Sequence, residues 1–442
     1  MKRVRLTRRD FFKAAAALAA APYVITSTAL VAEDRPPASE RIVCGHIGMG
    51  AQGSSLLGGF LGNPNAQSVA VCDPDKWRRD NAKQRADQRY GTRTDGPQGG
   101  VVAYNDFREL IARSDIDAVV MAVPDHWHAL ISVMAMQAGK DVYCEKPLAL
   151  TIRQGREMVK AARRYGRVFQ TGTMQRSMPG FRQACEIALN ARIGKVTRVF
   201  WGAGGPSSDV VMPAEPVPEG LDWDLFLGPA PWRPYNKRFA QAGGIFGFGA
   251  WHGCRDFCGG SMTDGCAHGA DIINWGVTAD QGDPVEVHPP GETYPTLTWK
   301  YPNGVLVHSW SPEYGIPKGH NGVLKAGGFG ALFVGDRGWV EVNRGYFKCY
   351  PESVAYEAPG PKDIRLYVST NHGQDFLDCI KTRKRPVADV LTGHRSAVLN
   401  HLGNIANWTG RVIKWDPVKE EILGDPEASR WLSRPMRAPW RL

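Results

Sequence analysis

The chain lacks the features that mark disulfide-rich or membrane-spanning proteins. It has nine cysteines, an odd number, and no two of them form a Cys-x-x-Cys pair. A disulfide framework is therefore disfavoured. The most apolar stretch, which ends near Leu30, is interrupted by Pro22 and is too short for a durable membrane span. No internal repeat is visible, so we expect an ordinary globular protein of two domains.

Basic residues give no reason to expect a nucleic-acid partner. The formal charge is +10, but the first 32 residues contribute six Lys/Arg and one Asp, so the remainder carries +5. The densest basic cluster, residues 381–385, is explained more simply as a solvated helix end. We therefore expect no binding of nucleic acid.

The N-terminus indicates where the protein works. Paired arginines, Arg8 and Arg9, precede two phenylalanines and an uncharged, alanine-rich segment, with small residues near Ala32 as cleavage sites. Residues 1–32 resemble a twin-arginine signal peptide, and the alternative is an amphipathic N-terminal helix. We expect the twin-arginine machinery to export the protein to the periplasm or otherwise out of the cytoplasm, with the signal either cleaved or retained.

A glycine-rich turn predicts a dinucleotide site. Gly48, Gly50 and Gly53 follow a strand-like segment and precede a helix-like one at residues 51–61. The glycines would permit a tight turn, close approach to a pyrophosphate and close packing of helix on strand. The free N–H groups at the helix start would then point at the phosphates.

An acidic residue follows the second predicted strand, residues 67–72. Asp73 would lie where a ribose hydroxyl binds, which disfavours a 2′-phosphate and makes NAD the first expectation. Arg78 and Arg79 lie close behind, so NADP stays open.

Alternating strands and helices continue to residue 166 and define a first domain over 41–166. The apolar run 117–123 is typical of a strand buried on both faces, and it delivers residues 124–128 to the carboxyl edge of the sheet. The strand at 141–144 delivers Glu145-Lys146-Pro147 to the same edge. Helices are expected at 77–90, 107–114, 129–137 and 152–165.

After residue 166 the composition changes. Long Gly/Pro/Trp-rich loops, notably 203–249, alternate with short strand-like segments and predict a substrate domain with a mixed sheet over 167–370. Helices at 373–381 and 394–408, within the C-terminal part 371–442, are expected to pack back on the first domain. The expected strands are 168–171, 196–202, 296–301, 305–309, 332–334 and 339–342.

Three residues could carry out alcohol oxidation, which needs a base for the hydroxyl proton while a hydride leaves. Lys146, beside the cation of NAD⁺, would have its pKa lowered by burial and by like charge, so that it could bind or relay a proton as an acid/base group. Asp264, His268 and Asp271 would share one face of a helix, with His268 as acid/base and Asp264 as its orienting or substrate-binding partner. The alternatives are a surface lysine and a structural hydrogen bond on the helix.

Other polar residues are weaker candidates. His126 and His128 could line the pocket or serve only as satisfied loop histidines. Gln175 and Arg176 could contact sugar hydroxyls. Asp271 could be purely structural.

A cluster of metal-ligand residue types lies in the second domain. Cys254, Cys258 and Cys266 are near His252 and His268, but the spacings match no standard zinc site. We expect no metal and buried free thiols.

Five segments together resemble the Gfo/Idh/MocA oxidoreductase family over residues 41–415: the glycine turn with Asp73, residues 124–128, Glu145-Lys146-Pro147, residues 259–271 and residues 392–406. The resemblance implies an α/β protein, with an N-terminal Rossmann domain and a C-terminal α+β domain built on an open mixed, largely antiparallel sheet. It implies catalytic and substrate-binding roles for Lys146, Asp264 and His268. The expected cofactor contacts are Gly48, Met49, Gly50, Gln52, Gly53, Asp73, Pro124, His128, Glu145 and Lys146.

The resemblance implies an exported NAD(P)-dependent oxidoreductase acting on a secondary hydroxyl of a sugar, cyclitol or related polyol. The alternative is an NAD-dependent glycoside hydrolase or lyase that oxidises a sugar hydroxyl transiently. Relatives of that second kind tend to depart from Glu-Lys-Pro, which this chain keeps. A non-catalytic binding protein would leave Lys146, Asp264 and His268 unexplained.

Two further expectations concern the assembled enzyme. No large pool of free nicotinamide cofactor is expected outside the cytoplasm, so we expect tightly bound NAD(P) and ping-pong hydride exchange between two substrates. The resemblance also implies a homodimer or homotetramer.

Overall fold

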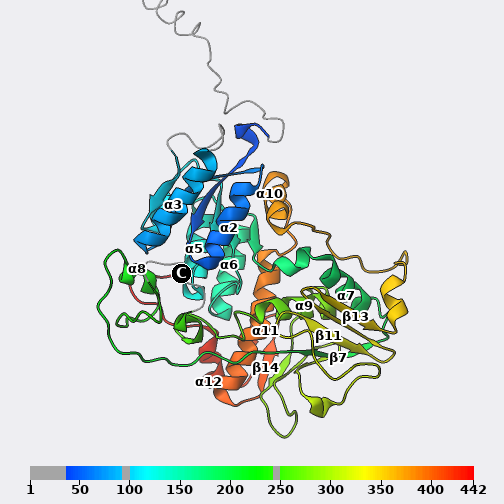
Figure 1. Cartoon of the computed structure of the whole chain (residues 1–442). Helices are drawn as coiled ribbons and strands as arrows, with labels where there is room; N and C mark the ends of the chain where they lie inside the picture. The colour runs from blue at the N-terminus through cyan, green and yellow to red at the C-terminus, as the bar shows by residue number, and fades with distance from the viewer. Residues whose placement is uncertain (1–35, 92–99, 242–248) are drawn as a thin grey trace, which may run out of the picture.

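The computed structural model describes residues 36–91, 100–241 and 249–442. Figure 1 shows two domains side by side, the first in blue and cyan and the second in green to red. The expected signal, residues 1–32, lies outside the described residues. Within the described ranges, no helix is both long and apolar enough to cross a membrane.

The first domain is a six-stranded parallel sheet with helices on both faces. Its strand order is β3-β2-β1-β4-β5-β6, so the direction of winding changes between β1 and β4. The carboxyl ends of these two strands therefore form the crevice in which such sheets bind ligands. The strands are β1 (Ile42–Ile47), β2 (Ala66–Cys72), β3 (Val102–Tyr104), β4 (Ala118–Met121), β5 (Asp141–Cys144) and β6 (Phe169–Thr171). The helices are α2 (Ala51–Gly62), α3 (Lys76–Gly91), α4 (Phe107–Ile111), α5 (Asp125–Gln137) and α6 (Ile152–Arg164).

The second domain is built on a nine-stranded sheet of order β13-β12-β11-β7-β10-β9-β8-β14-β15. The pair β7 and β10 is parallel and the other pairs with a stated direction are antiparallel, so the predicted mixed, largely antiparallel sheet is confirmed. The strands are β7 (Val196–Trp201), β8 (Glu286–His288), β9 (Thr298–Lys300), β10 (Leu306–Ser309), β11 (Ala331–Gly335), β12 (Trp339–Asn343), β13 (Tyr346–Tyr350), β14 (Ile413–Asp416) and β15 (Glu421–Ile422).

Helices cover one face of this second sheet. Buried side chains of α7 (Pro179–Leu189), α9 (Ala267–Thr278) and α11 (Val390–Thr409) share one apolar cluster with the strands. Helix α11 also contacts α6 of the first domain and lies between the two domains (Figure 1). Helix α10 (His372–Thr382) packs beside Tyr143 of β5. The remaining short helices are α8 (Trp223–Leu227) and α12 (Pro426–Ser429).

Several local predictions were wrong, two of them at the site. Helix α11, for instance, begins at Val390 and not at residue 394. The strand expected in the second domain at 168–171 is β6, which pairs with β5, so the first sheet extends to Thr171. Helix α5 begins at Asp125, four residues earlier than expected, directly after the extended residue Pro124. Helix α9 begins only at Ala267, so Asp264 lies in the preceding turn and not on the helix.

That turn has a physical cause in the glycine pair before it. Gly260 adopts φ +83°, a conformation that disfavours other residues, and the N–H of Asp264 donates to its carbonyl oxygen at 3.0 Å. The chain therefore closes a tight turn before the helix starts. Asp264 approaches the cavity from this turn, while His268 approaches from the first turn of α9.

Candidate active site

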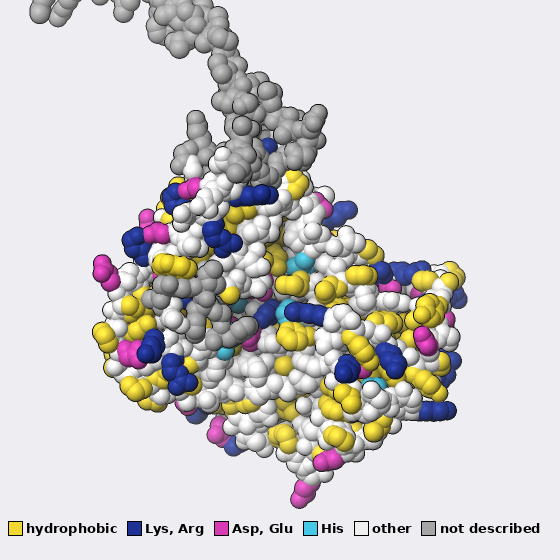
Figure 2. Space-filling view, viewed as in Figure 1, with side chains coloured by type: hydrophobic (Ala, Val, Ile, Leu, Met, Phe, Trp, Pro, Cys, Tyr) yellow, Lys and Arg dark blue, Asp and Glu magenta, His cyan; other side chains and the backbone are white. Residues whose placement is uncertain are grey.

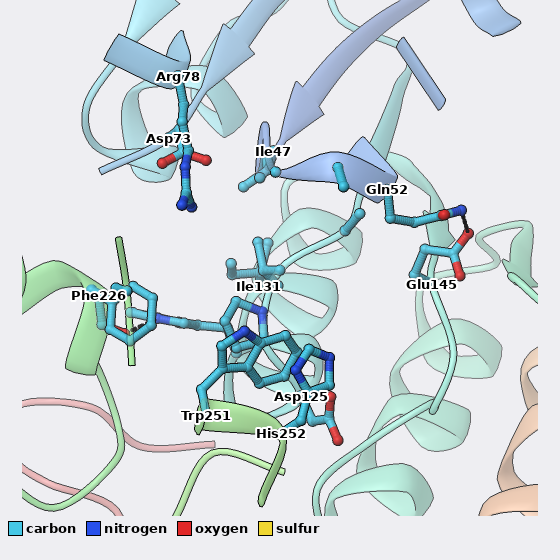
Figure 3. Close-up of a pocket in the computed structure, with 18 of the residues that line it drawn as sticks. Ile47, Gln52, Asp73, Arg78, Asp125, Ile131, Glu145, Phe226, Trp251 and His252 are labelled. Atoms are coloured by element: carbon cyan, nitrogen blue, oxygen red, sulfur yellow. Dashed lines mark hydrogen bonds between the residues drawn. The ribbon is translucent and has the colours of Figure 1, made fainter. Parts of the chain in front are cut away.

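A cavity of about 440 Å³ lies at the carboxyl edge of the first sheet and extends to the second domain. Figure 3 shows side chains from both domains directed into it. Nine residues predicted for the cofactor or for catalysis line this one cavity: Gly48, Gly50, Gln52, Asp73, Pro124, Glu145, Lys146, Asp264 and His268.

The glycine turn is sterically closed to larger residues. Gly48 has φ +85°, and a Cβ placed on Gly53 would lie 1.7 Å from the carbonyl oxygen of Gly48. The turn and the start of α2 therefore pack backbone against backbone, as a dinucleotide-binding turn requires. The open side of the turn borders the cavity, and α2 begins there at Ala51 with its N–H groups available for an anion.

Asp73 lies at the end of β2 and is held by the backbone. Its Oδ2 accepts from the N–H of Met49 at 2.7 Å and its Oδ1 from the N–H of Asp75 at 2.9 Å. Burial raises the pKa of Asp73, opposed by the charge of Arg78. A carboxylate has further lone pairs for ribose hydroxyls, so the turn and Asp73 together fit a dinucleotide.

The two arginines near Asp73 differ in position. Arg78 lines the cavity next to Asp73 (Figure 3). Arg79 donates to Asn105 Oδ1 at 3.0 Å and to the carbonyl oxygen of Asp73 at 3.2 Å, and it does not line the cavity. Only Arg78 is thus in position to meet a 2′-phosphate.

Glu145 connects the glycine-turn helix to the end of β5. Gln52 Nε2 donates to Glu145 Oε1 at 2.8 Å (Figure 3), and the N–H of Lys146 donates to Oε2 at 3.2 Å. Burial raises the pKa of Glu145, and the charge of Lys146 opposes this. A Cβ on Gly172 would lie 2.7 Å from the Glu145 carboxyl group, so a larger residue there would displace that carboxyl group.

Lys146 crosses from the first domain to the second. Its Nζ lies 2.5 Å from Asp264 Oδ1 and 3.3 Å from the Asp264 carbonyl oxygen. Burial lowers the pKa of Lys146, but Asp264, Glu145 and Asp125 together outweigh it, so the net change is upward. In the protein alone the pKa of Lys146 thus changes in the direction opposite to the lowering expected beside NAD⁺, because three carboxylates face the ammonium group.

His268 is neutral in this environment. Burial, with contributions from the charges of Lys146 and Arg344, holds its pKa well below the usual value. Its Nδ1 is buried and has no hydrogen-bond partner among the described residues. His268 lines the cavity, so its neutral imidazole can accept a proton from a bound hydroxyl, although the lowered pKa makes it a weaker base than a free imidazole.

Asp125 is a site residue that the sequence reasoning did not select. It is 3% exposed, lines the cavity in the first turn of α5, and its Oδ2 has no partner among the described residues. Burial and the charge of Asp264 raise its pKa to about 7, partly offset by hydrogen bonds from Cys258 and Gly259. The signal was an acidic residue directly after a buried strand at the carboxyl edge.

The second domain adds further lining residues that the sequence reasoning did not select for the site, and four of them are Trp251, His252, Phe329 and Arg344. Trp251 and His252 pack ring on ring with centroids 3.5 Å apart (Figure 3), and His252 Nε2 lies 3.5 Å from Asp264 Oδ2. Phe329 and Arg344 complete this side of the cavity. All four come from loops or short turns, where no periodic pattern indicates position.

Several predicted contacts lie behind the cavity wall. Met49 and Gly53 do not line the cavity and shape the turn from behind. The ring nitrogens of His128 lie 2.6 Å from the Pro147 carbonyl oxygen and 2.8 Å from that of Val123, so His128 ties together two segments of the wall. His126 Nε2 lies 3.0 Å from the Phe226 carbonyl oxygen and also points away.

Gln175 and Arg176 do not reach the cavity. Arg176 is 1% exposed and pairs with Asp271 and Asp280, each at 2.7 Å, so the structure gives it and Asp271 a structural ion pair and no substrate contact. Gln175 is fully buried, donates to the Phe329 carbonyl oxygen at 2.5 Å and accepts from Arg344 Nε at 3.0 Å. Gln175 thus supports two lining residues from below.

All nine cysteines lie among the described residues, and each is buried and unpaired. Cys258 contacts Asp125, and Cys266 Sγ accepts from the N–H of Gly204 at 3.1 Å. No group of three His, Cys, Asp or Glu residues within the described ranges is arranged to hold a metal ion.

Comparisons with known proteins agree with this geometry. Residues 42–173 match a family model described as an oxidoreductase family with an NAD-binding Rossmann fold. Residues 184–299 and 362–442 match the model for a C-terminal alpha/beta domain of an oxidoreductase family. Together the two models cover most of the chain.

Individual relatives are more distant. An alpha-N-acetylgalactosaminidase of Shewanella oneidensis is 30% identical over 174 residues, which are 36% of this chain and 37% of that protein. The WlbA dehydrogenase from Bordetella pertussis, solved with NADH and UDP-GlcNAcA, has a TM-score of 0.56 and 18% identity, covering 86% of this chain and 99% of its own. An aldose-aldose oxidoreductase from Caulobacter crescentus, complexed with glycerol, has a TM-score of 0.51 and 18% identity, covering 85% of this chain and 99% of its own. At these identities the two solved structures show a shared fold.

Proposed function

Since this chain belongs to the Gfo/Idh/MocA oxidoreductase family, we propose that it moves a hydride between a nicotinamide cofactor and a secondary hydroxyl of a sugar, cyclitol or related polyol. The observation that carries the proposal is the contact between Lys146 and Asp264. It joins the end of β5, beside the dinucleotide turn, to the His268 side of the same cavity. The cofactor would supply the hydride acceptor, and the residues around the contact would handle the proton.

His268 acts as the base in this proposal. The imidazole is neutral because burial and nearby cations hold its pKa low. It can therefore take the hydroxyl proton as the C–H hydride departs, and it returns that proton when the reaction runs in reverse. Its own charging is disfavoured by Lys146, so the proton must be passed on to water once the product leaves.

Lys146 and Asp264 orient the hydroxyl that reacts. The raised pKa of Lys146 keeps the ammonium group charged at neutral pH, so it can donate to the substrate oxygen and stabilise negative charge there. Asp264 contacts both Lys146 and His252. It can accept from a neighbouring sugar hydroxyl and fix which carbon faces the cofactor.

A second candidate is a glycoside hydrolase or lyase that uses transient oxidation of a sugar hydroxyl. The similarity to an alpha-N-acetylgalactosaminidase over about a third of each chain favours it. Glu145-Lys146-Pro147 at the strand end favours net oxidation. Both reactions begin with the same hydride transfer and differ in whether the hydride returns.

One experiment separates the two candidates. The purified protein is loaded with NAD⁺, mixed with a panel of sugars, polyols and nitrophenyl glycosides, and scanned for the reduced-nicotinamide band. A lasting band with a sugar or polyol supports the dehydrogenase. Release of nitrophenol without a lasting band supports the glycosidase. The proposal would be contradicted if wild type gave neither a reduced-nicotinamide band nor nitrophenol and the His268→Ala variant gave the same result.

Export is part of the proposal, and it makes a tightly held cofactor useful. Paired arginines before an uncharged segment support passage through the twin-arginine machinery. We expect NAD, or NADP if Arg78 accepts the 2′-phosphate, to stay bound through dialysis and to exchange hydride between two substrates in turn. Rapid loss of nucleotide on dialysis would count against this.

We also propose a homodimer or homotetramer. The loop that packs over Phe200, Leu332 and Trp339 of the second sheet exposes Ile316 and Val323, which suit contact with a second copy. Light scattering at micromolar concentration should give a multiple of the monomer mass, and a monomeric mass would refute it.

A further inference from the structure

We infer that the substrate carries a carboxylate, and that Arg344 binds it. The residue lies in the turn between β12 and β13 and lines the cavity on the His268 side. This inference rests on the proposed function in one respect, since it assumes that a sugar or polyol occupies the cavity. Figure 2 shows Lys, Arg and His side chains together near the centre of the visible face, between the two domains.

The side chain of Arg344 is held in place on two sides. Its Nε donates to the fully buried Gln175 at 3.0 Å, and its guanidinium carbon lies 4.6 Å from the centre of the Phe329 ring. Gln175 in turn fixes the Phe329 backbone at 2.5 Å. Arg344 is exposed on its hairpin turn, but a hydrogen bond and a cation–π contact pre-position its side chain.

The guanidinium group of Arg344 forms no ion pair within the described residues, although the charge of Glu145 favours its charged form. The lining cations are Arg78, Lys146 and Arg344. Arg78 lies 3.7 Å from Asp75 and Lys146 lies 2.5 Å from Asp264, but no carboxylate among the described residues forms an ion pair with Arg344. The hydrogen bond to Gln175 uses Nε, which leaves the donors of both Nη atoms for a ligand.

The lining carboxylates are already engaged elsewhere. Glu145 accepts from Gln52, Asp264 pairs with Lys146, and Asp73 accepts two backbone N–H groups at the nucleotide end. The fourth, Asp125, is buried beside Cys258 and Gly259, with its pKa raised to about 7. A ligand anion is therefore the group that would match the free cation.

The distances suit one sugar ring. The Phe329 ring centre lies 5.6 Å from the His268 ring centre and 4.6 Å from the guanidinium carbon. The guanidinium group is thus within about 10 Å of the base, close enough for one ring to meet both by hydrogen bonds. A single negative charge matches the single free guanidinium, and its planar fork matches a carboxylate with two parallel hydrogen bonds.

The substrate class that follows is a sugar acid, either a uronate or an aldonate. A phosphorylated sugar carries more charge than this one cation can neutralise, so we expect it to bind less well. A neutral sugar would leave the guanidinium group without a partner of opposite charge.

The test compares matched ligands on the loaded protein. Isothermal titration of the NAD⁺-bound enzyme uses glucose with glucuronate, galactose with galacturonate, and glucose 6-phosphate as the alternative anion. We expect a uronate to bind about 10- to 100-fold more tightly than its neutral partner. Equal binding within both pairs, tighter binding of the phosphate, or no binding of either acid would overturn the inference.

Variants assign the preference to the residue. Arg344→Gln should abolish the preference for the acid over its neutral partner, while Arg344→Lys should keep part of that preference. The matched control is Arg337→Gln in the preceding hairpin turn, whose side chain donates to the Ala191 carbonyl oxygen away from the cavity. A preference that survives in Arg344→Gln would also overturn the inference.

Binding and hydride transfer are recorded on the same samples, so the two proposals fail separately. Selective binding of the acid without a reduced-nicotinamide band supports the role of Arg344 and counts against the oxidoreductase. Oxidation of neutral polyols without any preference for acids supports the oxidoreductase and counts against the role of Arg344.

Discussion

Replacing Asp125 by Asn should change how stability depends on pH. The side chain is 3% exposed, and its pKa is raised from 3.8 to about 7 by burial and by the charge of Asp264. In the unfolded chain the pKa returns to about 3.9. Between these two values the folded protein holds a proton that the unfolded chain has released.

The sign follows from this difference in bound protons. Because the folded state binds more protons between about pH 4 and pH 7, the free energy of unfolding falls as pH rises through that window and levels off above it. The difference between 3.8 and about 7 corresponds to about 4 kcal/mol at about 1.36 kcal/mol for each pH unit. Asparagine has no such proton and keeps an acceptor oxygen for Cys258 and Gly259.

The measurement is urea unfolding followed by tryptophan fluorescence at about pH 5, 6, 7 and 8. The free energy of unfolding of Asp125→Asn minus that of wild type should rise with pH, by up to about 4 kcal/mol over the whole window. The control is Asp80→Asn, an exposed carboxylate paired with Lys76 on the surface of α3, for which the difference should stay flat.

A flat or falling difference for Asp125→Asn would refute the reasoning. It would mean that Asp125 is already ionised in the folded protein, with Lys146 compensating its charge. Lys146 would then face one more negative charge than it does beside a protonated Asp125.

Three further substitutions test the site. Gly53→Ala places a Cβ 1.7 Å from a carbonyl oxygen of the turn, so calorimetry should show nucleotide affinity lowered at least about 10-fold, while Gly59→Ala, with open space around it, should bind normally. Asp73→Asn should raise the affinity for NADP⁺ relative to NAD⁺ about 10-fold, and an unchanged ratio would mean that Asp73 does not select the cofactor. Asp264→Asn removes the largest contribution that raises the pKa of Lys146. In this variant the fall of kcat/KM at high pH should therefore begin at lower pH, and kcat should be about 100-fold lower. If the fall of kcat/KM began at the same pH as in wild type, the pairing of Lys146 with Asp264 would be contradicted.

The cofactor side of the site was predictable because its signals are local. Each of its residues directly follows a short apolar strand, and the ends of parallel strands meet at one edge of the sheet. The glycine turn, Asp73 and Lys146 were found in this way. Asp125 follows the same rule, but its helix was expected to begin four residues later, so its place in the first turn was missed.

The substrate side was less predictable because its residues lie in turns. The position of each turn depends on contacts with segments that are distant in the sequence. Arg344 reaches the cavity only because β12 and β13 pair and lie over α7, and Phe329 only because Gln175 binds its carbonyl oxygen. The spacing of Asp264 and His268 suggested a shared helix face, and the glycine-containing turn before α9 overrode that spacing.

The polar contacts around Lys146 form an unbroken series from the cofactor helix to the substrate domain. Gln52 donates to Glu145, Glu145 accepts from the backbone of Lys146, and the Lys146 ammonium group contacts Asp264. A buried ion pair adds little to stability, since desolvation offsets the attraction, but it fixes orientation well. The series therefore sets the direction of Lys146 and Asp264 relative to the turn that would hold the cofactor. Because Gln52 lies in the first turn of α2, nucleotide binding at that turn should change the electrostatic environment of Lys146, and the charge on the reacting pair should depend on the redox state of the nicotinamide.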